Sequence, residues 1–227
     1  HSLTLAEEAY KANPLPLYIL QEGNTLYALK EYEKACEKYL SLRETNMRSA
    51  QIFLYAAQCK RMAKTDTLQI LALQDSAVAC FKKPYPKDAA PSLLERSNTL
   101  LELGRYREAI ADLNEYEHLM SNELTAYFYY RREQAEMQCR MFQQAVDDID
   151  RAIRMEPKEP LYHAERAVVY YRLGEFEEAL KSAQKSAELN PKFGDAYRLA
   201  GICQLRLNQR EKGLSNLKKA IELGDES

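Results

Sequence analysis

The sequence predicts an all-α protein, and three observations support that prediction. The eight prolines fall in four short clusters, so the long stretches between them lack the residue that most strongly breaks helices. Glycine is also scarce, with seven residues among 227, whereas loop-rich folds need more. Apolar residues in the proline-free stretches recur at spacings of three and four, as in Leu93, Leu94, Leu100, Leu101, Leu103, Ala109, Ile110 and Leu113.

Composition excludes several classes of protein. Hydrophobic residues make up 46% of the chain, which is enough for a sizeable core and excludes intrinsic disorder. The 32 Lys+Arg nearly balance the 34 Asp+Glu, so the chain has no basic field for nucleic acid or for an anionic lipid surface. No stretch approaches the roughly 18 uninterrupted apolar residues of a membrane helix. We therefore expect neither nucleic-acid binding nor membrane insertion.

A turn signal divides the leucine-rich run into two helices. Leu103-Gly104-Arg105 separates the first set of apolar residues from the second, which predicts a helical hairpin. The pattern Leu-Gly-x-aromatic-x-Glu-Ala at 103–109 recurs at 173–179, with variants at 140–145 and 30–35. Ala145 and Ala179 are 34 residues apart, and a proline follows each of them twelve residues later.

A 34-residue period of paired helices resembles the tetratricopeptide repeat. The resemblance implies a right-handed superhelical solenoid of helix–turn–helix hairpins. We predict one solenoid domain over 1–227, with repeats at 16–49, 50–86, 90–123, 126–159, 160–193 and 194–227. The family places small residues at positions 8 and 20, where the two helices cross. Here these are Gly23, Ala57, Ser97, Ala167 and Gly201 at position 8, and Ala35, Ala72, Ala109, Ala145, Ala179 and Gly213 at position 20.

Two repeats depart from the pattern. Glu133 stands at position 8 of the fourth repeat, so we expect its first helix to sit differently. In the second repeat, residues 63–67 lengthen the turn by about three residues, and Ala72, Ala79 and Pro84 are predicted to restore the spacing.

The two ends suggest further expectations. Residues 2–15 read as the second helix of a preceding repeat, and the sequence does not begin with Met. Either an export signal has been removed or the chain is a piece of a longer one, so the compartment, cytoplasmic or exported, stays open. No polar capping helix follows the sixth repeat. Solenoids need capped ends for solubility, so homo-oligomerisation through uncapped ends is a further expectation.

No motif points to catalysis. The three histidines, His1, His118 and His163, lie near no Cys or carboxylate in a triad or ligand pattern, and His163 is predicted to pack in the core. The five cysteines (Cys36, Cys59, Cys80, Cys139, Cys203) contain no Cys-x-x-Cys pair, and no glycine-rich phosphate loop is present. A single disulfide stays open. We predict no catalytic residue, no metal and no cofactor.

The resemblance implies a binding groove lined by the first helix of each repeat. Position 9 carries a series of amides: Asn24, Gln58, Asn98 and Gln134. Because an amide both donates and accepts hydrogen bonds, such a series can pair with the backbone of an extended peptide. The alternative is that these amides simply occupy a solvated face.

Apolar and aromatic residues accompany the amides at neighbouring groove positions. Aromatic residues and Arg are frequent where partners bind, because they combine buried area with a polar tip. The candidates are Leu20, Leu54, Tyr55, Leu94, Tyr127, Tyr130, Arg131 and Arg198, whereas Tyr129 is predicted to be structural.

Members of the family that bind chaperone tails hold a C-terminal carboxylate with Lys, Asn and Arg at set positions of three repeats. The corresponding residues here are Leu20, Asn24, Tyr55, Pro91 and Glu95. Only Asn24 matches, and Glu95 would repel a carboxylate, so such a clamp is not expected. The prediction is a non-enzymatic scaffold that binds an extended peptide or helix of a protein partner. The alternative is a sensor or docking segment of a longer regulatory protein.

Overall fold

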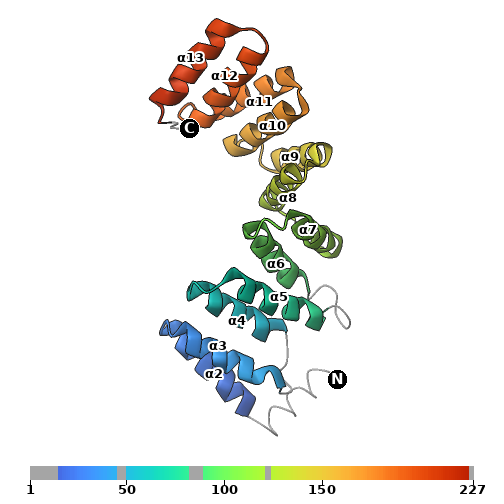
Figure 1. The fold of residues 1–227 in the computed structure, drawn as a ribbon, viewed down its shortest axis with the longest axis vertical. Coiled ribbons are helices and arrows are strands. Elements are labelled where there is room, and N and C mark those ends of the chain that lie inside the picture. Colours follow the sequence, from blue (N-terminus) through green and yellow to red (C-terminus); the bar gives the residue numbers. More distant parts are fainter. Residues whose placement is uncertain (1–14, 45–49, 82–88, 121–123, 225–227) are drawn as a thin grey trace. The chain divides into compact units, whose positions relative to one another are not determined.

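The computed structural model describes residues 15–44, 50–81, 89–120 and 124–224, and these residues form helices without strands (Figure 1). The helices are α2 (Leu15–Ala28), α3 (Tyr32–Ser41), α4 (Ala50–Met62), α5 (Thr67–Phe81), α6 (Ala90–Glu102), α7 (Tyr106–Met120), α8 (Ala126–Gln138), α9 (Phe142–Met155), α10 (Pro160–Leu173), α11 (Phe176–Leu189), α12 (Gly194–Arg206) and α13 (Arg210–Glu222), with a short 3₁₀ helix η1 (Leu42–Glu44). The predicted all-α class is confirmed.

Each pair of helices along the chain forms a hairpin, from α2/α3 to α12/α13. The helices of a pair meet through the small residues expected at their crossing. Ala35, Ala109, Ala145 and Ala179 are all fully buried. In the last hairpin the approach is closer still, since a Cβ placed on Gly201 would come within 2.9 Å of the carbonyl oxygen of Gly213. Small residues therefore allow close packing of the two helices in these hairpins.

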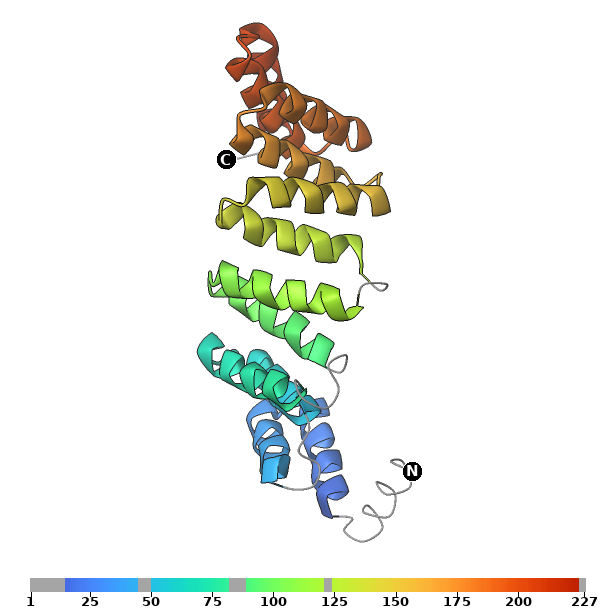
Figure 2. The same ribbon diagram turned by 90° about the vertical axis from the view of Figure 1, so that its right-hand side faces the viewer.

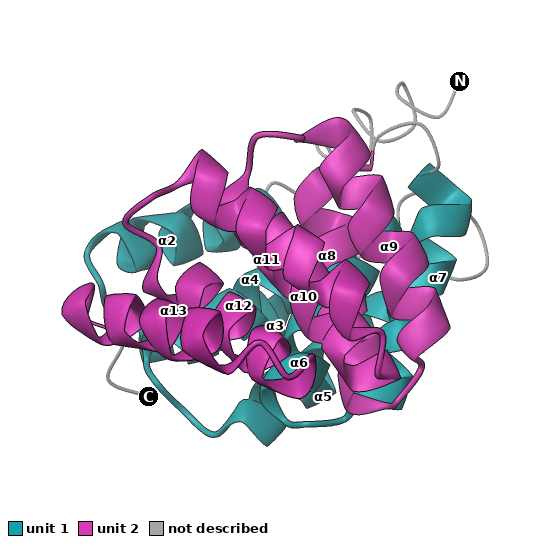
Figure 3. Ribbon diagram, turned by 90° about the horizontal axis from the view of Figure 1, so that it is seen from above, with its two compact units in different colours: residues 1–121 teal, residues 122–227 magenta. Residues whose placement is uncertain are grey.

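The chain divides into two compact units, residues 1–121 and 122–227, which Figure 3 colours separately. In the first unit, α3 packs on α4 and α5 packs on α6, so successive hairpins stack. In the second unit, α9 packs on α10 and α11 on α12, and this stacking can be followed in Figure 2. Each unit has its own buried clusters, such as Cys36, Tyr39 and Ile52 in the first and Ala164, Ala167 and Ala183 in the second.

The turn inside every hairpin contains one residue with a left-handed backbone. These residues are Lys30, Lys64, Gly104, Arg140, Gly174 and Asn208, with φ between 55° and 84°. Such a conformation is costly for residues other than glycine. The turn geometry is therefore imposed by the packing of the two helices as well as by the local sequence.

The predicted register of the second hairpin was wrong. Ala72 and Ala79 are exposed, whereas Ile70 and Ala77 are 4% and 0% exposed. Ala77 packs in one cluster with Ala50 and Phe53 of α4. The turn between α4 and α5 consists of residues 63–66, only one more than the turn of residues 103–105 between α6 and α7. The insertion is therefore shorter than expected, and an isoleucine takes the place that alanine or glycine has elsewhere.

Ion pairs join the two helices of several hairpins at one register. Arg96 of α6 donates two hydrogen bonds to Asp112 of α7, at 2.7 and 2.6 Å. Arg132 of α8 does the same to Asp148 of α9, at 2.5 and 2.9 Å, with both side chains buried. We call these pairs the hairpin latches. Sequence reasoning did not identify them.

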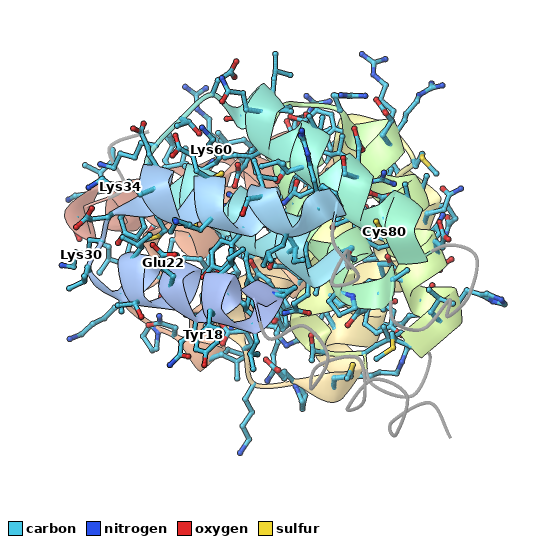
Figure 4. The ribbon with its side chains drawn as sticks, turned by 90° about the horizontal axis from the view of Figure 1, so that it is seen from below. Tyr18, Glu22, Lys30, Lys34, Lys60 and Cys80 are labelled. Atoms are coloured by element: carbon cyan, nitrogen blue, oxygen red, sulfur yellow. The ribbon has the colours of Figure 1, made fainter. Side chains whose placement is uncertain are left out.

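The first hairpin carries the latch with its charges reversed. Glu22 of α2 accepts from Lys38 of α3 at 3.0 Å, and both side chains are partly exposed. Figure 4 shows Glu22 on the side of α2 that faces α3, with Tyr18 pointing outward and Lys30 at the turn. The spacing of 16 residues is the same as between Arg96 and Asp112, so the register is kept while the polarity is inverted.

All five cysteines are free thiols, and burial raises the pKa of Cys59 and of Cys203 to about 11. His163 is buried, and its Nε2 donates to the carbonyl oxygen of Pro157 at 2.9 Å, which fits a packing role. None of the helices in the described residues is both long and apolar enough to cross a membrane. The half repeat predicted at 2–15 lies almost wholly outside the described residues.

Candidate functional site

The first unit has a hollow of about 430 Å³ between α4 and α6, the first helices of two successive hairpins. Three predicted groove residues of α4, Leu54, Tyr55 and Gln58, line it. The remaining wall is formed by Gln51, Ala57, Arg61, Gln74, Pro91 and Glu95. The hollow thus combines apolar, aromatic and amide side chains on the face predicted to bind.

Hydrogen bonds across this hollow hold α4 to α6. Arg61 donates to the carboxylate of Glu102 at 2.7 Å and to the hydroxyl of Thr99 at 2.8 Å. Gln74 reaches from α5 and donates to the backbone carbonyl of Glu95 at 3.2 Å. Gln58 is exposed, and among the described residues it has no hydrogen-bond partner. Its amide is therefore available to a ligand without breaking an existing contact.

The second unit has a larger hollow, of about 660 Å³, between α8 and α10. We call it the α8–α10 hollow. Its lining is Glu133, Gln134, Met137, Gln138, Arg140, Phe142, Glu165, Val168 and Arg172. Of the predicted groove residues only Gln134 lies here. Again the walls belong to the first helices of two successive hairpins.

Glu133 forms the most unusual part of this lining. Its side chain is 1% exposed, and its Oε2 atom has no hydrogen-bond partner within the described residues. Burial, together with the nearby acids Glu165, Glu136 and Asp148, raises the pKa of Glu133 to about 9. Burial also raises the pKa of Glu165, on the facing helix. At neutral pH Glu133 therefore holds a proton.

Asn24 and Gln134 already take part in hydrogen bonds within the chain. The hydroxyl of Tyr39 donates to Asn24 Oδ1 at 2.8 Å. Gln134 Nε2 donates to the hydroxyl of Tyr130 at 2.7 Å. Asn24 and Asn98 line neither hollow, and Asn98 is half-buried. The four amides thus differ in their surroundings, and Gln58 and Gln134 are the two that face a hollow.

The aromatic candidates of α8 form a small cluster. Tyr127 is 58% exposed and lies 6.1 Å from Tyr130, ring centre to ring centre. The guanidinium of Arg131 lies 6.0 Å from the ring centre of Tyr127. Tyr130 is half-buried against Tyr162, and burial raises its pKa to about 12. Tyr129 packs edge-on against the buried Phe128, as expected of a structural residue.

The other candidates lie in different surroundings. Leu20 packs against the buried cluster around Cys36, and Leu94 is half-buried on α6. Arg198 pairs with Asp195 of its own helix at 2.5 Å. None of these three lines either hollow.

Of the residues that line the α8–α10 hollow, sequence reasoning selected only Gln134 for the groove. The charged residues that it missed are Glu133, Glu165, Arg140 and Arg172. The one available signal was Glu133 itself, an acid at a position where the other repeats have Gly, Ala or Ser. A residue that lines the hollow opposite Glu133 could have been sought on the first helix of the next hairpin. Arg140 and Arg172 are both exposed at the rim.

Comparison with known proteins supports the repeat assignment. The family model for the tetratricopeptide repeat matches residues 160–193. The wheat protein "Hsp70-Hsp90 organizing protein" is 24% identical over 216 residues, which cover 94% of this chain and 35% of that protein. "Hsp70-Hsp90 organizing protein 2" of Arabidopsis thaliana is 27% identical over 212 residues, 89% of this chain and 34% of the relative. The chain therefore spans about a third of the length of these curated relatives.

Solved structures share the fold. MamA has a TM-score of 0.68 at 22% identity, with 77% of this chain and 91% of MamA covered. YrrB, described as a TPR protein with an unusual peptide-binding site, has a TM-score of 0.67 at 19% identity, with coverage of 84% and 94%. At these identities the likeness concerns the fold. Taken with the hairpins and their small crossing residues, the matches support a tetratricopeptide repeat protein.

Proposed function

We propose that this chain is a non-enzymatic protein–protein interaction scaffold whose first helices bind an extended peptide segment of a partner. One observation carries the proposal. In each unit a hollow lies between the first helices of two successive hairpins, and residues predicted for the groove line both hollows. Concave sites that combine apolar walls with a few polar groups are where ligands bind most often.

The hollow of the first unit suits an extended backbone. Leu54 and Tyr55 offer apolar and aromatic surface, and Gln58 offers an unpaired amide beside them. An amide of this kind can pair with both the N–H and the C=O of a peptide. The hollow can therefore recognise the backbone of a bound peptide in addition to one of the peptide's side chains.

The relatives favour a peptide ligand, but the residues favour one of a different kind from a chaperone tail. The relatives are named as organisers of Hsp70 and Hsp90, and YrrB is described with a peptide-binding site. In this chain Glu95 lines the hollow of the first unit, where a carboxylate clamp would need a cation. We therefore propose an internal segment of the partner as the ligand, not its terminal carboxylate.

Affinity capture followed by peptide binding tests the proposal. The chain is used to capture partners from host lysate, and overlapping peptides of each captured protein are then measured by fluorescence anisotropy. The variant changes the four amides Asn24, Gln58, Asn98 and Gln134 to Ala. We expect about a tenfold loss of peptide affinity or more, since several hydrogen bonds are removed together.

A matched variant controls for loss of amides in general. Gln69, Gln143, Gln144 and Gln184 are exposed amides on second helices, and all four are changed to Ala. This variant is expected to bind as the native chain does, and circular dichroism confirms that both variants fold. Equal peptide affinity of native chain and groove variant would contradict the amide contribution. Peptides that bind neither protein would contradict the function.

A second function is favoured by the length of the relatives. Since the chain corresponds to about a third of each curated relative, we also propose that it can act as a docking segment within a longer regulatory protein. The full-length reading frame of the gene tests this directly: an adjacent effector domain supports it, and a frame no longer than this chain contradicts it.

A further inference from the structure

Two acids form the floor of the α8–α10 hollow. The buried Glu133 lines it from α8, and the half-buried Glu165 lines it from α10. Within the described residues no ion pair joins either carboxyl group to a cation, and Glu133 Oε2 accepts no hydrogen bond. A buried charged or polar group without a partner is unfavourable, and it persists in a fold where a ligand or a function requires it.

Three apolar side chains lie beside this floor, together with the amides of Gln134 and Gln138. Met137 of α8, Phe142 of α9 and Val168 of α10 line the same hollow as the two acids. A lysine or arginine side chain has this same combination of a methylene stem and a charged tip. The hollow, at about 660 Å³, is large enough for such a side chain together with neighbouring parts of a peptide. Among the described residues no three ligand-type side chains gather to hold a metal ion.

The charges around the hollow also favour a cation at its floor. The groups that face Glu133 are Glu136 on its own helix, Asp148 on α9 and Glu165 on α10. Asp148 is already paired with Arg132, so Glu165, Glu136 and the protonated Glu133 are the acids left to meet a cation. Arg140 and Arg172 lie exposed at the rim, where solvent screens them more than it screens the buried acids.

We propose that the α8–α10 hollow receives a lysine or arginine side chain of the partner's peptide, held between the carboxyl groups of Glu133 and Glu165. The inference rests on the proposed function, because it names the chemistry of one residue in the peptide that this surface binds. In the free protein a proton on Glu133 takes the place of the cation. Binding of the cation transfers that proton to the buffer, so the charge of the floor stays balanced.

A positional-scanning library of capped nonapeptides tests the inference. The library holds Lys, Arg, Gln, norleucine or Glu at one position and varies the others, and the readout is peptide captured by the intact chain. We expect Lys and Arg to be enriched over norleucine at one position by about tenfold. The double variant Glu133→Gln/Glu165→Gln keeps the shape of the floor and is expected to lose that enrichment.

Matched variants and pH distinguish the floor from other acids. Glu177→Gln, an exposed substitution on α11, is expected to keep the enrichment. Affinity for the selected peptide is expected to rise between pH 6 and pH 9, as the proton on Glu133 becomes easier to displace. Isothermal titration in two buffers of different ionisation enthalpy then measures the proton released on binding.

The outcomes separate this inference from the proposed function. Peptides that bind without preference for Lys or Arg would leave the scaffold function standing and overturn the inference. A basic preference that survives in the Glu133→Gln/Glu165→Gln variant would also overturn it, because the cation would then be bound elsewhere. A library that yields no bound peptide at all would contradict both.

Discussion

Glu133 is the residue at which this chain departs most from its own pattern. The other hairpins place Gly, Ala or Ser at the same crossing, whereas here a carboxyl group is 1% exposed among other acids. Because burial and these neighbours raise its pKa to about 9, the folded state binds a proton that the unfolded chain releases above its ordinary value of 4.5. Folding is therefore linked to pH through this residue.

The linkage has a definite sign. The raised pKa stabilises the fold at low pH, and this contribution is lost progressively as the pH rises from about 4.5 toward 9. Glu133→Gln removes the ionisable group, so the variant is expected to be more stable than the native chain by about 1–3 kcal/mol at pH 8 and to differ little at pH 4.5. Thermal unfolding across this pH range measures the difference. The exposed substitution Glu177→Gln should leave the native pH profile unchanged, and a Glu133→Gln profile parallel to it would contradict the linkage.

The candidate site was only partly predictable at the scale of residues. The amide and aromatic residues could be chosen because the repeat fixes which positions face the groove, and Leu54, Tyr55, Gln58 and Gln134 do line hollows. Whether the side chain of such a residue is free to bind a ligand depends on whether a residue of another helix already forms a hydrogen bond with it. Tyr39 of α3, which hydrogen-bonds Asn24, illustrates this, because nothing in the spacing of α2 indicates the contact.

At the scale of helices, the hairpin latches differ in how deeply they are buried. Arg132 and Asp148 are 6% and 4% exposed, whereas Lys38 and Glu22 are 41% and 53% exposed. A buried pair loses much when one partner is removed, since the remaining charge has no water to solvate it. An exposed pair loses little.

Replacing the basic residue of each latch by alanine compares how much the two latches contribute to stability. Arg132→Ala is expected to lower the free energy of unfolding by about 3–5 kcal/mol, because Asp148 stays buried without its main partner. Lys38→Ala is expected to lower it by less than about 1 kcal/mol. Urea denaturation followed by circular dichroism measures both. The double variant Arg132→Met/Asp148→Leu should recover much of the loss, and equal costs for the two single variants would refute the role of burial.

The elements themselves were largely predictable, and the second hairpin shows where prediction failed. Helix positions followed from proline clusters and apolar spacing, which are local signals. The register of α5 depends on how long its preceding turn is, and Ala72 and Ala79 have the right residue type and spacing on the wrong face. Ile70 holds the crossing position instead, at 4% exposure. Only packing against α4 distinguishes these two registers.

At the scale of the whole molecule, the chain consists of two units with separate cores. The buried clusters around Ala167, Ile149 and Val169 are made only of residues from the second unit. Repeat proteins are stabilised by each repeat and its interfaces with the next, and about three repeats are needed for a stable fold. The second unit contains three hairpins and meets this requirement.

We therefore expect residues 122–227 to fold when expressed alone. The fragment should show helical circular dichroism and a cooperative thermal transition, whereas residues 160–227, with two hairpins, should unfold at a lower temperature. Heating both fragments beside the whole chain makes the comparison. If the longer fragment proved unfolded while the whole chain is folded, the second unit would not be a folding unit in its own right.

The reversed polarity of the first latch limits how such a gene can recombine. A crossover that joined α2 to α7 would set Glu22 against Asp112, and one that joined α6 to α3 would set Arg96 against Lys38. Both products would place like charges at a helix crossing. Exchange of a complete hairpin keeps each pair matched. For exchanges between the first hairpin and the third or fourth, the heritable module is therefore the helix pair and not the single helix.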